Sequence, residues 1–345
     1  MNLLAALTAK ARAAAHPRAG EGTCECGAPA LLADRPDATV VRHAGTVAKA
    51  HAPGTDSAEL SLRLATAAHC PDVLLAPLGP APVPLHDRLV SLWPYGAPVD
   101  PDDPDAAPWE AVATLLARLH NTTPPGTLPP MRGPAKSALA IARLRTALRT
   151  TPETAPAPEA FPHSAPQSIP YASPSPTPPL TEPHAAARIV LRAWGGLPAW
   201  ARAEEVMPGP AVLCHGDLHL GQLVRHPAPG GPWRLIDVDD LGVGVPAWDL
   251  ARPAAWYACG LLPPDEWTRF LSAYQRAGGP AVPPDADPWA ALDVPARALT
   301  VQTAALAITK ALAAHRPLDE VEQALIEACA RMTSAPRRLP PGFPG

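Results

Sequence analysis

The stretch that decides the fold of this chain is AVLCHGDLHLGQLV, residues 211–224, and its companion is RLIDVDD, residues 234–240. Each segment opens with a short apolar run of strand character, and each delivers carboxylates where that run ends. Unpaired Asp is costly to bury, so carboxylates at the ends of two neighbouring strands are poor core material. We therefore expect both sets of charges to face a common cleft, with a divalent cation as their partner.

Three side chains in these segments offer the oxygen atoms that magnesium prefers. Asp217 opens a loop after the first strand, and Gln222 follows five residues later with an amide oxygen. Asp237 then ends the next β-hairpin with a full carboxylate. One carboxylate of this set is left over, and a carboxylate near a metal-bound phosphate can accept a proton from an attacking hydroxyl.

These residues resemble the aminoglycoside phosphotransferase family of small-molecule kinases, which share the two-lobed protein-kinase-like fold. The family's catalytic signature is His-Gly-Asp followed, after four more residues, by Asn, and here it reads HGDLHLGQ over residues 215–222. Its metal-binding signature, Ile-Asp followed by Gly-x-Pro-x-x-Asp-Leu-Ala, reads IDVDDLGVGVPAWDLA over residues 236–251. The resemblance implies an α+β fold, with a small N-lobe of β-sheet plus helix and a larger, mainly helical C-lobe.

The resemblance also implies a role for each matching residue. Asp217 would be the catalytic base, Asp237 the principal Mg²⁺ ligand and Gln222 the second metal ligand. Upstream, Lys49 would hold the α- and β-phosphates of ATP or GTP, with Glu59 keeping the lysine extended. From the residues alone, this strand lysine and helix glutamate either form an ion pair across a cleft or are a solvated lysine and a carboxylate that favours a helix N-terminus.

The sequence around the lysine fits such an N-lobe. Residues 28–51 read as three short β-like pieces separated by turns, which predicts an antiparallel meander. A helix is expected to begin at residues 55–57. A further strand is expected over residues 85–93. Leu92, Trp93 and Tyr95 would then belong to the interlobe hinge, whose backbone meets the adenine in this family.

Four other polar residues of the two segments are open to more than one interpretation. His215 and Asp249 would brace the catalytic loop rather than touch substrate. His219 and Asp239 are either structural or peripheral to the metal, and the sequence does not choose between these roles. A hydrolytic metal site of His215, Asp217 and His219 would need a further histidine cluster, and none stands at a convincing spacing.

Two departures from the family pattern bear on function. Gln222 stands where the family has Asn, and the loop HLGQ at 219–222 is similar to that of actinobacterial maltokinase and glucosamine kinase relatives. That similarity points to a sugar acceptor. The hairpin at 33–38, which would cover the phosphates, contains no glycine, although Arg35 offers a charge contact.

The composition argues against several classes of protein. The formal net charge is -4 and no Lys/Arg-rich run occurs, so a nucleic-acid-binding surface is not expected. No apolar run is long enough to span a bilayer, and the first positive charges follow the first apolar residues, which is the wrong order for a secretory signal. We expect a cytoplasmic protein, monomeric or homodimeric, without nucleic-acid or membrane partners.

The six cysteines are scattered, which predicts reduced thiols rather than a disulfide framework. Cys24 and Cys26 form the only close pair. A Cys-x-Cys-Gly knuckle can contribute to a zinc site, but no second knuckle of matching spacing follows it. A structural metal is therefore the minor alternative at this pair.

The length of 345 residues allows two lobes. Residues 1–20 predict an Ala-rich helix that is an appendage to the fold, and residues 151–183, rich in Pro, Ser, Thr and Ala, predict a disordered insertion in the C-lobe. The expected division is an N-terminal extension at 1–23, an N-lobe at 24–93, a hinge at 94–98, a C-lobe at 99–334 and a C-terminal tail at 335–345.

The expected reaction is transfer of the γ-phosphoryl group of ATP or GTP, with Mg²⁺, to a hydroxyl of a small molecule. An aminocyclitol antibiotic, which is a polycation, would fit a cleft lined with acidic side chains such as Asp239 and Asp240. A neutral or amino sugar would instead fit the loop that contains Gln222. The alternative from another class is a catalytically weak pseudokinase that binds a nucleotide or a partner, and the intact base, metal-ligand and lysine positions count against it.

Overall fold

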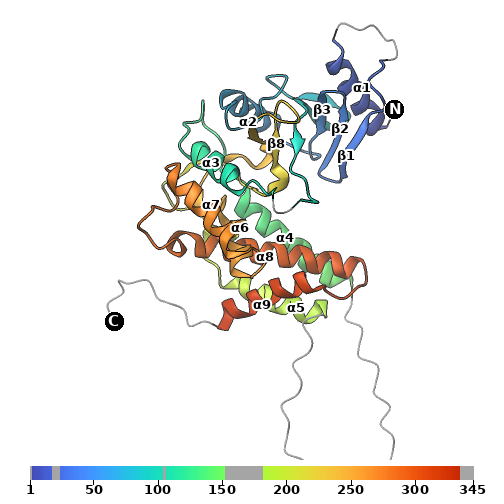
Figure 1. Cartoon of the computed structure of the whole chain (residues 1–345). Helices are drawn as coiled ribbons and strands as arrows, with labels where there is room; N and C mark the ends of the chain where they lie inside the picture. Colours follow the sequence, from blue (N-terminus) through green and yellow to red (C-terminus); the bar gives the residue numbers. More distant parts are fainter. Residues whose placement is uncertain (1, 18–23, 104–105, 152–181, 335–345) are drawn as a thin grey trace, which may run out of the picture. The chain divides into compact units, whose positions relative to one another are not determined.

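The computed structural model describes residues 2–17, 24–103, 106–151 and 182–334 (Figure 1). The expected insertion at 151–183 thus lies almost wholly outside the described residues. The chain divides into two compact units, and each unit gathers segments that are distant in sequence. The first unit contains Met1–Gly133, Val206–Ala254 and Leu262–Pro295, and the second contains Pro134–Glu205, Ala255–Leu261 and Ala296–Gly345. The division into an N-lobe, a hinge and a C-lobe stays a prediction.

An antiparallel five-stranded sheet forms the N-terminal part of the first unit, in the order β1-β2-β3-β5-β4. The three-stranded meander expected over residues 28–51 is confirmed. Central strand β3 pairs with β2 on one side and β5 on the other, so Lys49 lies between Val40 and Ser91. The strands are β1 (Ala30–Arg35), β2 (Ala38–His43), β3 (Thr46–Ala50), β4 (Val83–Leu85) and β5 (Arg88–Pro94).

The strand expected over residues 85–93 is confirmed from Arg88 onward, but its expected start is wrong. The structure has a tight hairpin there, because β4 ends at Leu85, β5 begins at Arg88, and these two residues pair across the turn. His86 in the turn has a φ of 55°, in the left-handed region that glycine and asparagine favour. Since neither of those residues marks the turn, the apolar pattern reads through it as one strand.

Helix α1 (Leu3–Ala15) is not the appendage that its Ala-rich sequence suggests. Leu7 and Ala11 are both fully buried, and they pack against Val41 and Ala48 of the sheet. Residues four apart lie on the same face of a helix, so these two side chains form one apolar stripe. Figure 1 shows the helix beside β2 and β3, and α1 is therefore part of the core of this sheet.

Three further helices of the first unit support the segments that carry the polar residues. The helix α2 (Ser57–His69) begins as expected, with the side chain of Asp56 accepting the backbone N–H of Glu59 at 2.9 Å. Helices α3 and α7 pack against each other, with Trp109 and Phe270 in edge-to-face contact. The bounds of the last two are α3 (Trp109–His120) and α7 (Pro264–Arg276), and helix α6 (Ala251–Ala258) begins in the first unit and ends in the second.

Two small sheets present the segments 211–224 and 234–240. In the first, β7 and β10 are paired antiparallel, and in the second β8 lies between β6 and β9. Each functional segment thus contributes a strand and then a tight turn at which its polar residues stand. These strands are β6 (Ala97–Pro98), β7 (Val212–Cys214), β8 (Leu223–Arg225), β9 (Trp233–Leu235) and β10 (Gly242–Gly244).

The second unit is helical in its described part. Helix α5 packs against α9, and the hydroxyl of Ser137 donates to the amide oxygen of Gln302 at 2.7 Å, which joins α4 to α8. The imidazole Nε2 of His184 lies 2.8 Å from the carbonyl oxygen of Thr151, so the two chain ends that flank residues 152–181 meet. The helices are α4 (Gly133–Thr150), α5 (Pro183–Gly195), α8 (Trp289–Ala313) and α9 (Glu320–Ser334).

The expected α+β class is confirmed, with an antiparallel N-terminal sheet followed by a mainly helical remainder. None of the helices in the described parts of the chain combines the length and the apolar character that crossing a bilayer requires.

Candidate active site

A lysine on the central strand of the sheet meets two carboxylates that follow β9. The Nζ atom of Lys49 lies 2.6 Å from Oδ1 of Asp237 and 3.0 Å from Oδ2 of Asp239. Asp237 has a φ of 68°, a strained conformation for a residue that carries a Cβ atom. The 3-10 turn Val238–Asp240 follows directly, and both carboxylates reach the same ammonium group. The segment 234–240 and β3 therefore build one site.

The charges of this cluster stabilise one another. Burial disfavours the charged form of Lys49, but the two neighbouring carboxylates outweigh it and raise the pKa of the lysine above its ordinary value. Burial likewise acts to raise the pKa of Asp237 and Asp239, and the ammonium group overcomes it and holds both below their usual range. At neutral pH the cluster is thus one cation between two carboxylates, with negative charge in excess.

His51 is a member of this cluster that sequence reasoning missed. Its Nδ1 lies 2.8 Å from Oδ1 of Asp239, and its Nε2 lies 2.7 Å from the hydroxyl of Ser91. The indole N–H of Trp93 donates to the same hydroxyl at 2.8 Å. A signal was present, because residues two apart on a strand share a face and His51 stands two residues after Lys49.

Glu59 lies elsewhere. Its carboxylate accepts from Arg63 at 3.0 Å, one helical turn later on α2, and the same guanidinium donates to the carbonyl oxygen of Leu241 at 2.9 Å. The expected ion pair between Lys49 and Glu59 is therefore not formed among the described residues. The physical reason is proximity, since Asp237 and Asp239 satisfy the lysine and the arginine at i+4 satisfies the glutamate.

The proposed base, Asp217, lies in the turn that follows β7. Its carboxylate accepts from the guanidinium of Arg252 at 2.7 Å, and the same guanidinium donates to the carbonyl oxygen of Leu218 at 2.9 Å. Arg252 thus fixes both the side chain and the backbone of the turn. It is a second residue that sequence reasoning missed, although it follows the Asp-Leu-Ala end of the metal-binding signature directly.

A buried carboxylate holds the start of this turn. Asp249 accepts the backbone N–H of His215 at 2.6 Å and that of Gly216 at 2.8 Å. It also lies 3.1 Å from Nε2 of His120, whose Nδ1 lies 2.8 Å from the hydroxyl of Tyr274. Burial acts to raise the pKa of Asp249, and the hydrogen bond and charge of His120 overcome it and lower the value. The turn is therefore braced from α3 and α7.

The glycine of the turn permits a close approach of the two functional segments. Gly216 has a φ of 86°, and a Cβ atom placed there would lie 2.4 Å from the carbonyl oxygen of Asp240. Beside it, Nε2 of His215 lies 2.8 Å from the carbonyl oxygen of Ile236. The contact of His215 holds the turn after β7 against the turn after β9, and glycine at position 216 leaves room for the two backbones to approach.

Gln222 lies next to the expected metal ligand. It is buried, and its amide nitrogen donates to Oδ2 of Asp237 at 3.2 Å. The two side chains are therefore neighbours, and each carries an oxygen atom of the kind that a hard cation such as Mg²⁺ prefers. Ligation by Gln222 requires its amide oxygen, so its amide group must turn over from the orientation in which the nitrogen faces the carboxylate.

His219 lies within electrostatic range of both Asp217 and Asp237. Burial is the largest influence and lowers the pKa of His219 to about 4, against the two carboxylates that act to raise it. The imidazole is therefore neutral at physiological pH. This leaves both of its expected roles open, structural or peripheral to the metal, but only as an uncharged group.

The hinge residues are engaged by the chain itself. The backbone N–H of Tyr95 donates to the carbonyl oxygen of Gly45 at 2.8 Å, and its carbonyl oxygen lies 3.1 Å from Nδ1 of His226. The carbonyl oxygen of Leu92 accepts from Leu78 at 2.8 Å. Adenine binding at Leu92, Trp93 and Tyr95 stays a prediction.

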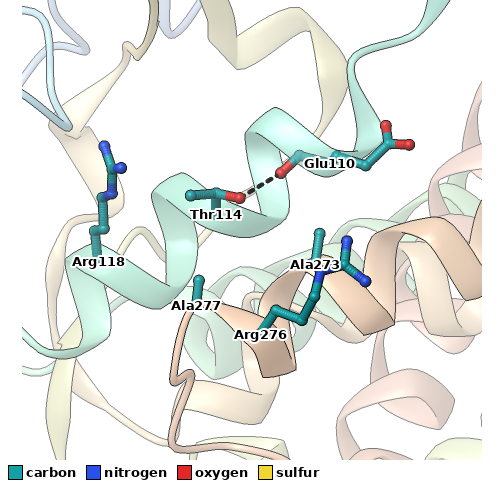
Figure 2. Close-up of a pocket in the computed structure, with 6 residues that line it drawn as sticks. All are labelled: Glu110, Thr114, Arg118, Ala273, Arg276 and Ala277. Carbon is teal, nitrogen blue, oxygen red and sulfur yellow. Dashed lines mark hydrogen bonds between the residues drawn. The ribbon is translucent and has the colours of Figure 1, made fainter.

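A surface hollow lies between α3 and α7, and none of the residues that line it belongs to the candidate active site or to the expected hinge. Figure 2 shows it lined by side chains of the two helices, with the hydroxyl of Thr114 bonded to the backbone oxygen of Glu110. The carboxylate of Glu110 is itself paired with Arg269. The hollow is therefore not part of the candidate site.

The chain is similar to known phosphotransferases and kinases in sequence pattern and in fold. A family model described as "Phosphotransferase enzyme family" matches residues 31–292. No curated protein sequence matches the chain. Among solved structures, a thermostable mutant of aminoglycoside phosphotransferase APH(4)-Ia, in a ternary complex with AMP-PNP and hygromycin B, has a TM-score of 0.53 at 12% identity, covering 89% of this chain and 94% of that one.

Two other similar structures are kinases of a different kind. The choline kinase from Cryptosporidium parvum has a TM-score of 0.52 at 10% identity and covers 90% of each chain. A choline/ethanolamine kinase family protein from Mesorhizobium loti has a TM-score of 0.50 at 16% identity, covering 94% of this chain and 95% of that one. At these identities the likeness shows a shared fold.

Proposed function

Since the chain belongs to the phosphotransferase enzyme family, we propose that it transfers the γ-phosphoryl group of ATP or GTP, with Mg²⁺, to a hydroxyl of a sugar-like small molecule. Membership makes it a small-molecule kinase and confirms the resemblance seen in the two sequence signatures. The observation that supports the proposal is the cluster of Lys49, Asp237 and Gln222, because the structure brings together the residues to which the family resemblance assigns phosphate and metal binding.

Each residue of the cluster has a task that its contacts support. Lys49 is held charged by its two carboxylate neighbours and is available to bind phosphate oxygens. Asp217, fixed by Arg252, would orient the acceptor hydroxyl and take its proton. Asp237 and Gln222 would hold Mg²⁺, which when bound neutralises charge on the phosphates. Catalysis would then rest mainly on positioning and on charge complementarity.

The charges around the site favour an acceptor that is neutral or weakly charged. A polycationic aminocyclitol was expected because Asp239 and Asp240 make the cleft acidic. Asp239 is instead engaged by Lys49 and His51, and the carboxylate of Asp240 lies 3.8 Å from Nε of Arg132. Since Asp239 and Asp240 are each already paired with a cationic side chain, Lys49 and Arg132 respectively, we favour a sugar or an amino sugar over an aminoglycoside-type antibiotic.

Nucleotide binding is tested by thermal stabilisation of the purified protein. Mg-ATP or Mg-GTP should raise the melting temperature of the wild-type chain, because a ligand that binds only the folded state stabilises it. Asp237→Ala should remove that rise, whereas Asp102→Ala, at an exposed turn position, should retain it. If no nucleotide shifts the wild-type melting temperature, the kinase assignment of this site fails.

The acceptor is tested by a screen of ADP or GDP release against sugars, amino sugars and aminoglycosides. The proposal expects turnover with a sugar or an amino sugar. Asp217→Asn should then lower kcat by about 10²–10⁴-fold and leave the nucleotide-dependent stabilisation intact. Turnover confined to aminoglycosides would refute the acceptor class but not the reaction. Nucleotide binding without turnover on any acceptor would favour a pseudokinase.

A further inference from the structure

Four side chains with metal-binding atoms converge where α1 meets the sheet. Nε2 of His16 lies 3.3 Å from Nε2 of His43, Sγ of Cys24 lies 3.1 Å from Nε2 of His43, and Sγ of Cys26 lies 3.4 Å from Nε2 of His16. All four ligand atoms lie within 4.8 Å of one another. The four atoms are therefore close enough together to share one metal ion.

The spacing of these atoms matches a tetrahedral zinc site. With Zn–N bonds of about 2.05 Å and Zn–S bonds of about 2.3 Å, tetrahedral geometry separates two nitrogen ligands by about 3.4 Å, and a nitrogen from a sulfur by about 3.6 Å. The observed separations of 3.3 Å between the two nitrogens and 3.4 Å between His16 and Cys26 lie within about 0.2 Å of these values, and that of 3.1 Å between His43 and Cys24 is about 0.5 Å shorter. Two thiolates and two imidazoles are a donor set typical of structural zinc.

Local structure presents each of the four ligands. His16 is the C-cap residue of α1, and His43 is the last residue of β2 and is buried. Cys24 and Cys26 lie on the segment before β1, which turns at Gly27 with a φ of 79°. Three separate chain segments thus contribute ligands, and the core beneath α1 joins two of them, α1 and β2.

We propose that His16, Cys24, Cys26 and His43 bind one Zn²⁺ ion and that this ion fastens α1 and the segment before β1 to strand β2. Four protein ligands fill a tetrahedron and leave no open position, so the ion would be structural rather than catalytic. His43 pairs with Thr46 beside the β2–β3 turn, whereas Lys49 lies further along β3. The zinc site is therefore distinct from the phosphotransferase cluster.

The first test is metal content and ligand geometry in the full-length protein, purified without chelators under a phosphine reductant. Mass spectrometry of the metal should find about one zinc per chain. Co²⁺ exchanged into the protein should give the intense visible bands of tetrahedral cobalt and a thiolate charge-transfer band. Absence of stoichiometric zinc together with the weak spectrum of octahedral cobalt would overturn the proposal.

Matched variants separate this site from adventitious binding. Cys24→Ser with Cys26→Ser should reduce the zinc content at least tenfold and remove the charge-transfer band, whereas Cys259→Ser, at another partly exposed cysteine, should change neither. Unchanged zinc content in the double variant would refute the assignment. A Cys24–Cys26 disulfide in the protein as isolated from the cell would refute it too.

His16→Ala keeps the test decisive if the double cysteine variant does not fold. His16 is only partly buried, so its replacement should leave a folded protein that binds zinc more weakly. A strong zinc chelator should lower the melting temperature of the wild type but not that of His16→Ala. An equal response of both proteins to the chelator would contradict the proposal. Nucleotide-dependent stabilisation reports separately on the phosphotransferase site.

Discussion

Any other residue at position 216 would be destabilising for two separate reasons, its backbone conformation and a steric clash. Its φ of 86° is unfavourable for a side chain, and its Cβ position lies 2.4 Å from the backbone oxygen of Asp240. Gly54 supplies a matched control, because its φ is 75° and a Cβ atom there would meet nothing within 4 Å.

We expect Gly54→Ala to lower the free energy of unfolding by about 1 kcal/mol through backbone conformation alone. Gly216→Ala should lower it by about 3 kcal/mol or more, because the contact with backbone cannot be relieved by rotating a side chain. Denaturant unfolding of both variants measures the difference. Equal losses at the two positions would mean that the turns after β7 and β9 separate at little cost.

Asp249 gives the protein a component of acid sensitivity. A carboxylate whose pKa is lowered by folding contributes stability above its unfolded pKa of about 3.9, and that contribution is lost as the pH falls below it. Asp249→Asn should therefore be less stable than wild type at pH 7, by about 2–3 kcal/mol, whereas the wild type should lose this advantage as the pH falls below about 4.

Stability measured against pH in the wild type, in Asp249→Asn and in the exposed control Asp102→Asn tests this assignment. The control should follow the wild-type curve. If the acid limb of Asp249→Asn runs parallel to that of the wild type, Asp249 does not supply the acid-sensitive component.

Sequence motifs predicted the expected base and metal ligands more readily than the residues that contact them. Asp217, Asp237 and Gln222 stand in signatures whose spacing is set by local strand and turn geometry, so short motifs carry them. The contacts that Arg252 and His51 make depend on how distant segments meet. Glu59 shows the converse, since a glutamate that can reach Arg63 within its own helix needs no partner across the fold.

At the scale of single elements, α1 shows how packing gives a weak helix a structural role. We expect Leu7→Ala to lower the free energy of unfolding by about 2–5 kcal/mol, because Leu7 is fully buried against the sheet. Leu4→Ala on the same helix is the control. That side chain is 39% exposed and should cost well under half as much.

Urea unfolding of the two leucine variants distinguishes a core helix from a peripheral one. A loss at Leu7 no larger than the loss at Leu4 would return α1 to the status of an appendage. Proteolysis near the N-terminus, compared between wild type and Leu7→Ala, gives an independent measure of whether the helix detaches.

Most helices could be predicted because each has its own apolar stripe and its own capping or terminating residues. Asp56 caps α2, and the spacing of Val112, Leu115, Leu116 and Leu119 marks α3. The β4–β5 hairpin could not, since its turn contains neither glycine nor asparagine. The burial of α1 could not be predicted either, because an apolar stripe does not state which surface will cover it.

At the scale of the whole molecule, the contact between Thr151 and His184 bears on the segment between them. The ends of that segment are 2.8 Å apart at their hydrogen-bonded atoms, so a short connection can join them without moving α4 or α5. We expect a chain in which a short Gly/Ser linker replaces residues 152–181 to be as stable as wild type, or about 1 kcal/mol more stable, because a shorter loop costs less entropy to close.

Thermal unfolding and nucleotide-dependent stabilisation of that shortened protein measure its integrity. Turnover should also stay near the wild-type rate on whichever acceptor the screen identifies. Loss of turnover with stability retained would assign the replaced residues to the acceptor site, and loss of stability would contradict their expected independence from the fold.

The chain of contacts from Tyr274 through His120 to Asp249 also constrains how such a protein can evolve. Replacing His120 alone would remove one hydrogen-bond partner from a buried phenol on one side and one from a buried carboxylate on the other. Descendants that lose the histidine must therefore acquire compensating changes at both neighbours, or first lose them. We therefore expect the residues at positions 120, 249 and 274 to covary among related proteins, so that they are either all retained or all replaced together.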